Sequence, residues 1–222
     1  MMDVLEAIQA RHAVRDFDCT PVPKETVIKI LEAATRSPSG GNGQPWELFV
    51  ASGGTMENIR KAYQERLRGG PPGGPGVPPG GPGGPPPAYI MERMATIRHE
   101  RMKLLGLDPA DPASGKIFRE WGARLFGAPV LVVICMDKAL NSNLDIGMMV
   151  QTICLAAQGF GVDSLIAAGL ISQQDILRKE LEIPENLNIV IGIGLGYPNP
   201  KSIINTYRSP RRPIDEVVRY KN

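Results

Sequence analysis

The spacing of hydrophobic residues along the chain predicts several amphipathic helices. Val4, Leu5 and Ile8 share one helical face near the start of the chain. Residues 24–36 keep the helical spacing until Pro38, which favours the end of a helix before it. Further helices are expected at residues 54–67, 89–105, 116–125, 144–159 and 172–181. Several of these helices follow one another without a strand between them.

Short apolar runs rich in β-branched residues predict about four strands. Residues 128–136, APVLVVICM, are apolar throughout, as expected for a strand that is buried on both faces of a sheet. The other strands are expected at residues 46–51, 164–168 and 188–198. Few strands and paired helices favour an α+β layered fold over a regular doubly wound one.

Three local features refine this pattern. The helix at residues 144–159 has little polar face, so it should lie in the core or at a subunit interface. Ser172 is expected to cap the helix that begins there. Residues 192–196, GIGLG, superficially resemble a dinucleotide-binding loop, but a proline follows where that loop requires a helix. We therefore expect a tight strand end at this place.

The composition favours one globular domain over residues 1–222. The 25 basic and 23 acidic residues are spread along the chain, whereas a nucleic-acid partner would call for a clustered basic face. The first residues lack the apolar core of a signal peptide, and the longest apolar run is too short to cross a bilayer. We expect a cytoplasmic protein with no nucleic-acid partner and no membrane segment.

The cysteines and histidines do not form a metal-binding pattern. Cys19, Cys135 and Cys154 are far apart in the sequence and show no Cys-x-x-Cys spacing. His12 and His99 cannot make a zinc site by themselves. We expect ordinary thiols and no metal.

Residues 69–87 are glycine and proline apart from one valine. They can neither propagate a helix nor supply a full sheet ladder, and glycine does not recur at every third position as in collagen. Proline doublets broken by glycine doublets favour a flexible insertion or loop. The alternative is a docking motif for a proline-binding module.

Three polar segments carry candidate chemistry. Arg11 and Arg15 lie near the end of the first helix, and arginine forks match the geometry of phosphate groups. Residues 36–46, RSPSGGNGQPW, combine small residues that let a ligand approach the backbone with hydrogen-bonding side chains. Residues 208–213, RSPRRP, form a basic cluster near the end. Taken alone, the first is also compatible with a solvated turn and the last with a loose tail.

Together these segments resemble the nitroreductase family. The matching motifs are, in chain order, RHAVR at 11–15, SPSGGNGQPW at 37–46, LAAQGFG at 155–161, GYP at 196–198 and RRP at 211–213. The resemblance covers nearly the whole chain, with the glycine-proline segment as the main exception. It implies an α+β layered fold with a central, mostly antiparallel sheet flanked by helices, in an intertwined homodimer. It also implies an oxidoreductase that binds FMN and uses NADH or NADPH.

The resemblance assigns cofactor-binding residues in three places. Arg11 would contact the FMN phosphate, with His12 and Ala13 in the same segment, and Arg211 matches a late phosphate-binding arginine. Arg15 would stabilise the negative charge that develops at flavin N1 and O2 on reduction, which makes it the expected catalytic residue.

The other two places supply backbone and small residues. The neighbouring subunit would line the flavin with Pro38, Ser39, Gly40, Gly41, Asn42 and Gln44. Ala167, Ala168 and Gly169 match a strand end whose backbone N–H faces flavin N5.

Two positions depart from the family pattern. Ala13 stands where a serine often donates to the phosphate, and the missing neutral hydrogen bond would cost about 1 kcal/mol of binding free energy. Ala168 stands where a functional side chain is common, but a backbone donor does not need one.

The family implies a ping-pong cycle in which a reduced nicotinamide and then a small acceptor use the same pocket. The covering loops that select the acceptor coincide here with residues 69–87 and the helices after them, which favours a permissive reductase of nitroaromatics or quinones. The alternatives are a specialised reductive dehalogenase, ene-reductase or flavin-processing enzyme, and a non-catalytic flavin-binding or interaction protein.

Overall fold

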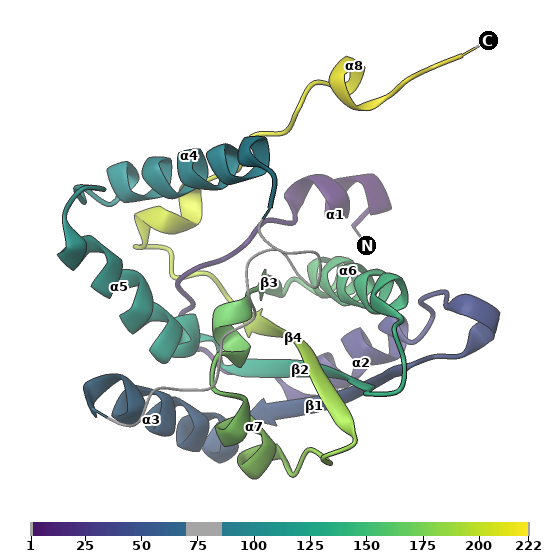
Figure 1. Cartoon of the computed structure of the whole chain (residues 1–222). Coiled ribbons are helices and arrows are strands. Elements are labelled where there is room, and N and C mark those ends of the chain that lie inside the picture. Colours follow the sequence, from purple (N-terminus) through teal and green to yellow (C-terminus); the bar gives the residue numbers. More distant parts are fainter. Residues whose placement is uncertain (1, 70–85, 222) are drawn as a thin grey trace.

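The computed structural model describes residues 2–69 and 86–221 (Figure 1). The predicted glycine-proline insertion therefore lies largely outside the described residues. The helices are α1 (Val4–Ala10), α2 (Lys24–Ala34), α3 (Gly53–Gly69), α4 (Ala88–Leu104), α5 (Pro112–Ala123), α6 (Asn143–Gly159), α7 (Gln174–Leu181) and α8 (Ile214–Val217). The strands are β1 (Trp46–Ser52), β2 (Val130–Asp137), β3 (Asp163–Ile166) and β4 (Leu187–Gly196). Short 3₁₀ turns are η1 (Gly40–Asn42), η3 (Leu125–Gly127), η4 (Ala168–Ile171) and η5 (Ile203–Thr206).

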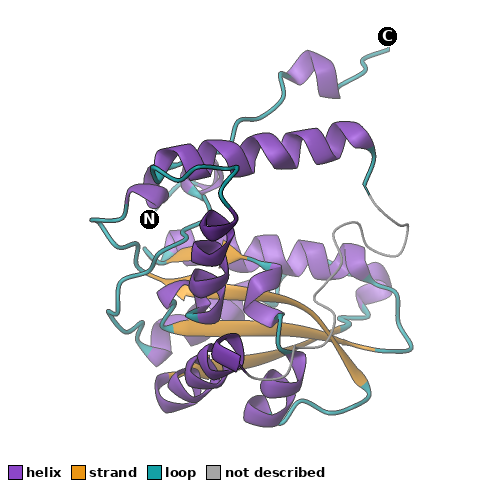
Figure 2. Ribbon diagram, turned by 60° about the vertical axis from the view of Figure 1, so that its left-hand side comes forward, coloured by secondary structure: helices purple, strands orange, loops and turns teal. Residues whose placement is uncertain are grey.

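The strands form one 4-stranded sheet in the order β1-β2-β4-β3, and each neighbouring pair is antiparallel. Helices cover both faces of this sheet (Figure 2). The α+β class and the antiparallel sheet flanked by helices are therefore confirmed. Each predicted helix and strand is present, with ends that shift by a few residues. The largest shift is at α5, which begins at Pro112 rather than Lys116 because Asp111 caps its first turn.

The central strand β2 contributes side chains to the hydrophobic cores on both faces of the sheet. Leu131 and Val133 belong to the hydrophobic core shared with α3 and α7, whereas Val132 and Ile134 belong to the core shared with α2 and α6. All four side chains are fully buried. Successive side chains of a strand point to opposite faces, so an unbroken apolar run supplies both cores, as the sequence predicts.

The helix α6 packs one side on the sheet, as expected for the most apolar helix. Met149 and Ile153 are fully buried in the core on that side, whereas Leu144 at its start is 78% exposed. The helix is thus a core element with an apolar residue left uncovered within one chain.

One local prediction was wrong. Ser172 does not cap α7, because the residue before that helix is Gln173 and the Ser172 hydroxyl donates to the carbonyl of Gly169. The alternating glycines of residues 192–196 form the end of strand β4, as predicted. A Cβ on Gly192 would lie 2.9 Å from the Cβ of Leu170, so this glycine allows η4 to pack closely on the sheet.

Candidate active site

The segment that holds Arg11 and Arg15 runs along the edge strand of the sheet. The helix α1 ends at Ala10, and Ala13 then forms an isolated parallel bridge with Ser164 of β3. The N–H of Val14, which is fully buried, donates to the carbonyl of Ser164 at 3.1 Å. The tertiary fold therefore fixes this segment as an extended edge rather than leaving it as a solvated turn.

The second predicted segment continues directly from the same strand. Ala167 follows β3, and its N–H donates to the carbonyl of Gly192 at 3.3 Å. The next turn, η4, is anchored by Leu170 and Ile171, which are buried against β4. Residues 11–15 and 167–169 thus lie on one edge of the sheet, and we call them together the arginine edge.

The backbone of the arginine edge is fixed by a residue that the sequence pattern did not single out. Asn205 in η5 accepts hydrogen bonds at Oδ1 from the N–H groups of Arg15 and Asp16, at 2.9 and 3.2 Å. Its Nδ2 donates to the carbonyl of Asp16 at 2.7 Å. Because these partners are about 190 positions apart, no local motif could have indicated the contact.

The electrostatics of Arg15 fit an anionic group. Its Nη1 donates to the carbonyl of Ala13 at 3.0 Å, which uses one of the five N–H donors of a guanidinium. In the part of the chain that the structure describes, no carboxylate forms a salt bridge with it. Burial, together with the charge of Arg101, lowers the pKa of Arg15 to about 10. An anion beside Arg15 would favour its charged form and so offset both the burial and the repulsion from Arg101.

Two neighbours of Arg15 also escaped the sequence analysis. Arg101 comes from α4, and burial lowers its pKa as well. Tyr207 follows η5, and its hydroxyl donates to Oε2 of Glu100 at 2.6 Å. These residues come from two elements far apart in the chain, so only the tertiary structure places a second guanidinium beside Arg15.

The remaining residues predicted for the phosphate are less firmly placed. Nδ1 of His12 lies 2.9 Å from the carbonyl of Ala10, which holds the ring against its own segment. Arg211 is exposed, and its Nη1 donates to the carbonyl of Ser209 at 2.8 Å. It lies in the tail that leads to α8, and within residues 2–69 and 86–221 its hydrogen bonds go to the carbonyls of Ser209 and Pro210 rather than to the arginine edge.

The loop formed by residues 38–44 is held on a different side of the molecule. The N–H of Gly40 donates to Oδ1 of Asp145 at the start of α6, and the Ser39 hydroxyl accepts from the N–H of Gln44. Gly41, Asn42 and Gln44 have positive φ angles, of 57°, 57° and 44°. Figure 1 shows η1 and the segment after α1 on opposite sides of the sheet. One chain therefore does not bring the 38–44 loop to the arginine edge.

A cavity of about 510 Å³ opens beside Gly169. The rings of Phe118 and Phe126 line it, together with Tyr63, whose buried hydroxyl donates to the carbonyl of Leu170 at 3.1 Å. Leu125, Phe126 and Gly127 all have positive φ angles, an unfavourable run for the first two. This strained turn sets the Phe126 ring 3.7 Å from the position of a Cβ on Gly169. The sequence signals only the glycine of this turn.

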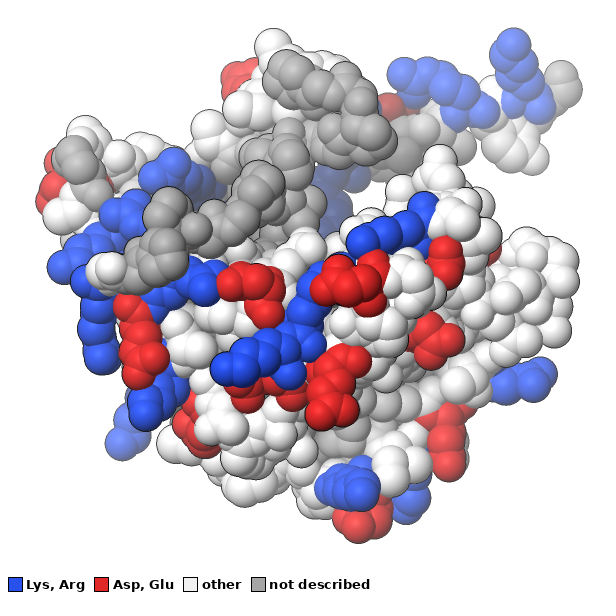
Figure 3. All heavy atoms as spheres, turned by 60° about the horizontal axis from the view of Figure 1, so that its bottom comes forward, with Lys and Arg blue, Asp and Glu red and all other residues white. Residues whose placement is uncertain are grey.

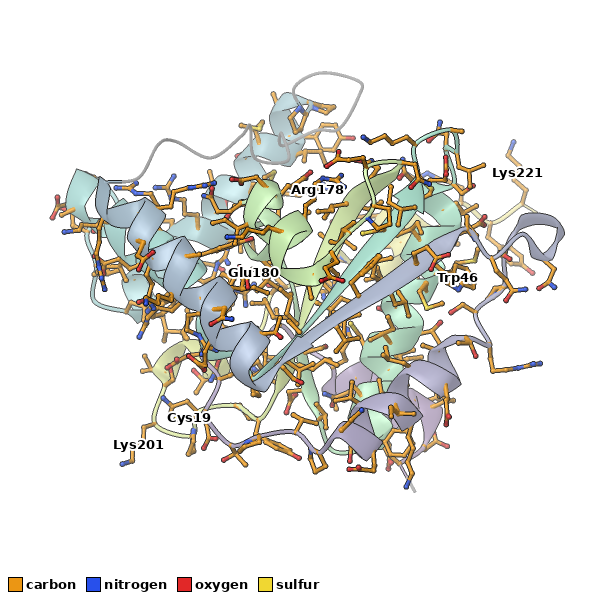
Figure 4. All side chains as sticks on the ribbon, turned by 90° about the horizontal axis from the view of Figure 1, so that it is seen from below. Cys19, Trp46, Arg178, Glu180, Lys201 and Lys221 are labelled. Atoms are coloured by element: carbon orange, nitrogen blue, oxygen red, sulfur yellow. The ribbon has the colours of Figure 1, made fainter. Side chains whose placement is uncertain are left out.

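Other candidate chemistry is limited. Burial raises the pKa of Cys135 to about 11 and raises that of Cys154 as well, so neither thiol is a ready nucleophile. Cys19 is exposed at the periphery, as Figure 4 shows. Over residues 2–69 and 86–221, no three His, Cys, Asp or Glu side chains are grouped to hold a metal ion. No helix in those ranges is long and apolar enough to cross a membrane.

Comparison with known proteins gives the chain a family. The family model described as "Nitroreductase family" matches residues 8–197. A nitrobenzene nitroreductase of Ectopseudomonas oleovorans is 34% identical over 217 residues, which cover 97% of this chain and 95% of that protein. A chloronitrobenzene nitroreductase of Comamonas testosteroni is 30% identical over 221 residues, with the same two coverages.

A solved structure agrees with these relatives. The FMN-dependent nitroreductase NfnB from Mycobacterium smegmatis, in complex with NADPH, superimposes with a TM-score of 0.89 at 26% identity. The match covers 99% of this chain and 100% of that chain. The chain belongs to the nitroreductase family, and the family predicted from the sequence motifs is confirmed.

Proposed function

We propose that this protein is an FMN-dependent oxidoreductase that takes electrons from NADH or NADPH and reduces a small nitroaromatic or quinone acceptor. The observation that carries the proposal is the arginine edge, where Arg15 is partly buried, has no carboxylate partner among the described residues and lies on the same sheet edge as Gly169. The relatives compared above are nitroreductases of nitrobenzene and chloronitrobenzene, and the mycobacterial structure is FMN-dependent with NADPH bound.

The proposal gives each part of the site a role. Arg11 and Arg211 would hold the phosphate of FMN, with His12 and Ala13 beside it. Arg15 would offset the negative charge that the ring gains on reduction, and a backbone N–H of the segment Ala167–Gly169 would be the donor to N5. When bound, FMN supplies a ring that accepts hydride and passes the electrons on. The protein residues therefore provide position and charge rather than a nucleophile.

The site requires a homodimer in this proposal, because the 38–44 loop cannot reach the arginine edge of its own chain. Pro38, Ser39, Gly40, Gly41, Asn42 and Gln44 of one chain would line the flavin of the other. Apolar side chains left uncovered support an interface. On α1, Val4 is 63%, Leu5 65% and Ile8 49% exposed, although their spacing is that of a buried helix face. Figure 1 shows α8 projecting from the body, as an arm around a partner would.

The cavity beside Gly169 is the place proposed for the acceptor. The Phe118 and Phe126 rings offer aromatic faces and edges to a planar aromatic compound. In a ping-pong cycle the nicotinamide ring would use the same place first and then leave. The described walls combine aromatic and apolar side chains with Arg66, Arg119, Ser172 and Gln173. The aromatic part can accept a planar ring whatever group the ring carries, which supports a permissive reductase.

The test begins with the absorbance spectrum of the purified protein and identification of any released cofactor as FMN. Anaerobic oxidation of NADPH or NADH is then followed with nitrobenzene, menadione and a panel of halogenated and unsaturated acceptors. Rapid reduction of several acceptors supports the proposal. Bound FMN without nicotinamide oxidation would instead indicate a non-catalytic flavin-binding protein, and turnover of one acceptor class alone would indicate a specialised enzyme.

Several expectations from the sequence stay predictions. They are the single domain over residues 1–222, the cytoplasmic location, the lack of a nucleic-acid partner and the role of residues 69–87. Deleting residues 70–86 tests the last of these. Unchanged acceptor range and KM values would show that the segment does not select the acceptor.

A further inference from the structure

A second cavity lies between α4 and α5, outside the site described above. Its volume is about 700 Å³, and it combines an apolar lining with cationic side chains. The apolar residues that line it are Met91, Met94, Ala95, Ile97 and Phe118, and the cationic ones are Arg93, Arg98, Arg101 and Arg119. We call this cavity the α4–α5 groove. Four arginines around an apolar lining form a site for an anion that also carries a flat apolar group.

The arginines of the groove are not neutralised by the surrounding protein. Within the described ranges of the chain, none of the four forms a salt bridge. Nη1 of Arg119 and Nη2 of Arg98 lie 3.5 and 3.8 Å from the position of a Cβ on Gly115. Two guanidinium groups from different helices thus meet at one glycine. Such a pair is suited to a doubly charged group, because each arginine can donate to a separate oxygen.

The groove is close to the arginine edge without being part of the acceptor cavity. Arg101 lines the groove and is near enough to Arg15 to lower its pKa. Phe118 and Arg119 line both the groove and the cavity beside Gly169, but Gly169 itself does not line the groove. A small acceptor placed at Gly169 can therefore contact Arg119, whereas Arg98 lines only the groove. A ligand that contacts both Gly169 and Arg98 must extend from one cavity into the other.

The charge distribution over the molecule is in keeping with this position. Figure 3 shows basic and acidic side chains mixed over much of the face that it presents, with basic ones gathered at its left edge. In Figure 1 that side of the molecule carries α3 and α5. The local excess of positive charge would attract a polyanion toward α5.

We infer that the α4–α5 groove binds the adenosine 2′-phosphate end of NADPH while its nicotinamide ring lies beside Gly169. This inference rests on the proposed function and adds to it a residue-level cause for a preference for NADPH over NADH. The dinucleotide is elongated, because a pyrophosphate and two riboses separate its rings, and it can therefore extend from one cavity into the other. The 2′-phosphate supplies the charge for Arg98 and Arg119, and the adenine supplies the flat group for the apolar lining.

The first experiment measures binding without turnover. Calorimetry compares adenosine 2′,5′-bisphosphate with AMP on the holoenzyme, on Arg98→Ala and on Arg119→Ala. We expect tighter binding of the bisphosphate by the wild type and a loss of about tenfold to a hundredfold in each variant, since hydrogen bonds to charged groups are of that strength. AMP affinity should change less. Lys29→Ala, which removes an exposed charge on α2, is the matched control. Equal affinities of the wild type for the two nucleotides would overturn the inference.

The second experiment separates this inference from the proposed function. The ratio of kcat/KM for NADPH to that for NADH should fall about tenfold or more in Arg98→Ala, with FMN content and NADH oxidation retained, because Arg98 lines the groove but not the cavity beside Gly169. The ratio should also fall in Arg119→Ala, but that variant is judged by the ratio alone because Arg119 lines both cavities. An unchanged ratio in active variants overturns the inference and leaves the proposed function intact. Loss of preference for 4-nitrobenzoate over nitrobenzene, without a change in the nucleotide ratio, would assign the groove to acidic acceptors instead. A wild type that oxidises neither nucleotide would reject the proposed function.

Discussion

The arginine edge and the 38–44 loop carry the two most specific motifs of the chain, yet the fold treats them differently. The edge is fixed from within, by the bridge of Ala13 to Ser164 and by the three hydrogen bonds of Asn205. The loop is fixed mainly by its own hydrogen bonds and by Asp145. It lies across the molecule from the edge (Figure 1).

Residues of one site therefore need not converge within one chain. The arginine edge and the 38–44 loop are each ordered within one chain, so neither needs the other in order to fold. The loop presents exposed glycines and polar atoms away from the edge of its own chain (Figure 1). A second copy of the chain can complete both at once, since a two-fold axis makes each chain donor and acceptor of the loop.

The largest expected effect comes from removing the charge of the edge. Arg15→Ala should slow flavin reduction by NADPH roughly 100-fold to 1,000-fold, the usual cost of losing one group that stabilises developing negative charge. Anaerobic stopped-flow absorbance measures the rate. Arg15→Lys keeps the charge but not the planar fork, so it should recover part of the loss. Lys29→Ala serves as the control, and an unaltered rate in Arg15→Ala would remove the assigned role.

The next experiment asks whether edge and loop of one site come from different chains. Gly41→Val places a β-branched side chain at a φ of 57° and should disable the loop. After Arg15→Ala and Gly41→Val proteins are unfolded and refolded together, about one quarter of wild-type activity should return. Half of the random dimers are then mixed, and each mixed dimer holds one intact site of two. Refolding each variant alone is the control. No recovery, despite mixed dimers seen by mass spectrometry, would place both parts of the site in one chain.

A smaller effect is expected at the exposed face of α1. Leu5→Glu puts a charge where the proposal places an apolar interface, and Leu5 is 65% exposed in one chain. The dimer dissociation constant should rise about tenfold or more, while the folded monomer should persist because the side chain is outside its core. Sedimentation equilibrium at several concentrations gives the constant, with Lys29→Glu as the charged control. An unchanged constant would mean that α1 is not at the interface.

The smallest effect concerns the positive φ angle of Gly41 in the loop. Gly41→Ala should lower the free energy of unfolding by about 1 kcal/mol, because a Cβ disfavours a positive φ although no atom lies within 4 Å of it. Gly54→Ala is the matched comparison, since Gly54 also has open space but has no positive φ and lies in α3. That change should raise the free energy by about 0.5–1 kcal/mol. Urea denaturation measures both free energies of unfolding, and equal shifts in the two variants would show that position 41 does not require a positive φ.

Much of the fold follows from local patterns. The unbroken apolar run of β2 predicted burial on both faces, and the helical spacing before Pro38 predicted α2. The failures were also local in origin. Serine is a residue type that often caps helices, but the Ser172 hydroxyl donates to the carbonyl of Gly169 in the adjacent turn η4. The left-handed pair Leu125 and Phe126 has no sequence signal, because neither residue favours that conformation.

The roles of the arginines likewise could not be read from the local sequence. Figure 4 shows Arg178 on α7, whose guanidinium donates to the carbonyls of Pro184 and Leu187 and so fixes the start of β4. Arg178 has a structural role, although it is the same residue type as Arg15 and Arg101. The three arginines differ in how many of their guanidinium N–H groups donate to backbone carbonyls of other segments, and that number depends on packing.

Local spacing and short motifs specify the helices and strands, the burial of β2 on both faces and the family. Packing in three dimensions leaves some arginines available to an anion, leaves one apolar helix face uncovered and keeps two motifs apart. Spacing specifies the face that a side chain occupies but not its partner. Partners such as Arg15 and Asn205, at opposite ends of the chain, are chosen by how the sheet and its helices pack together.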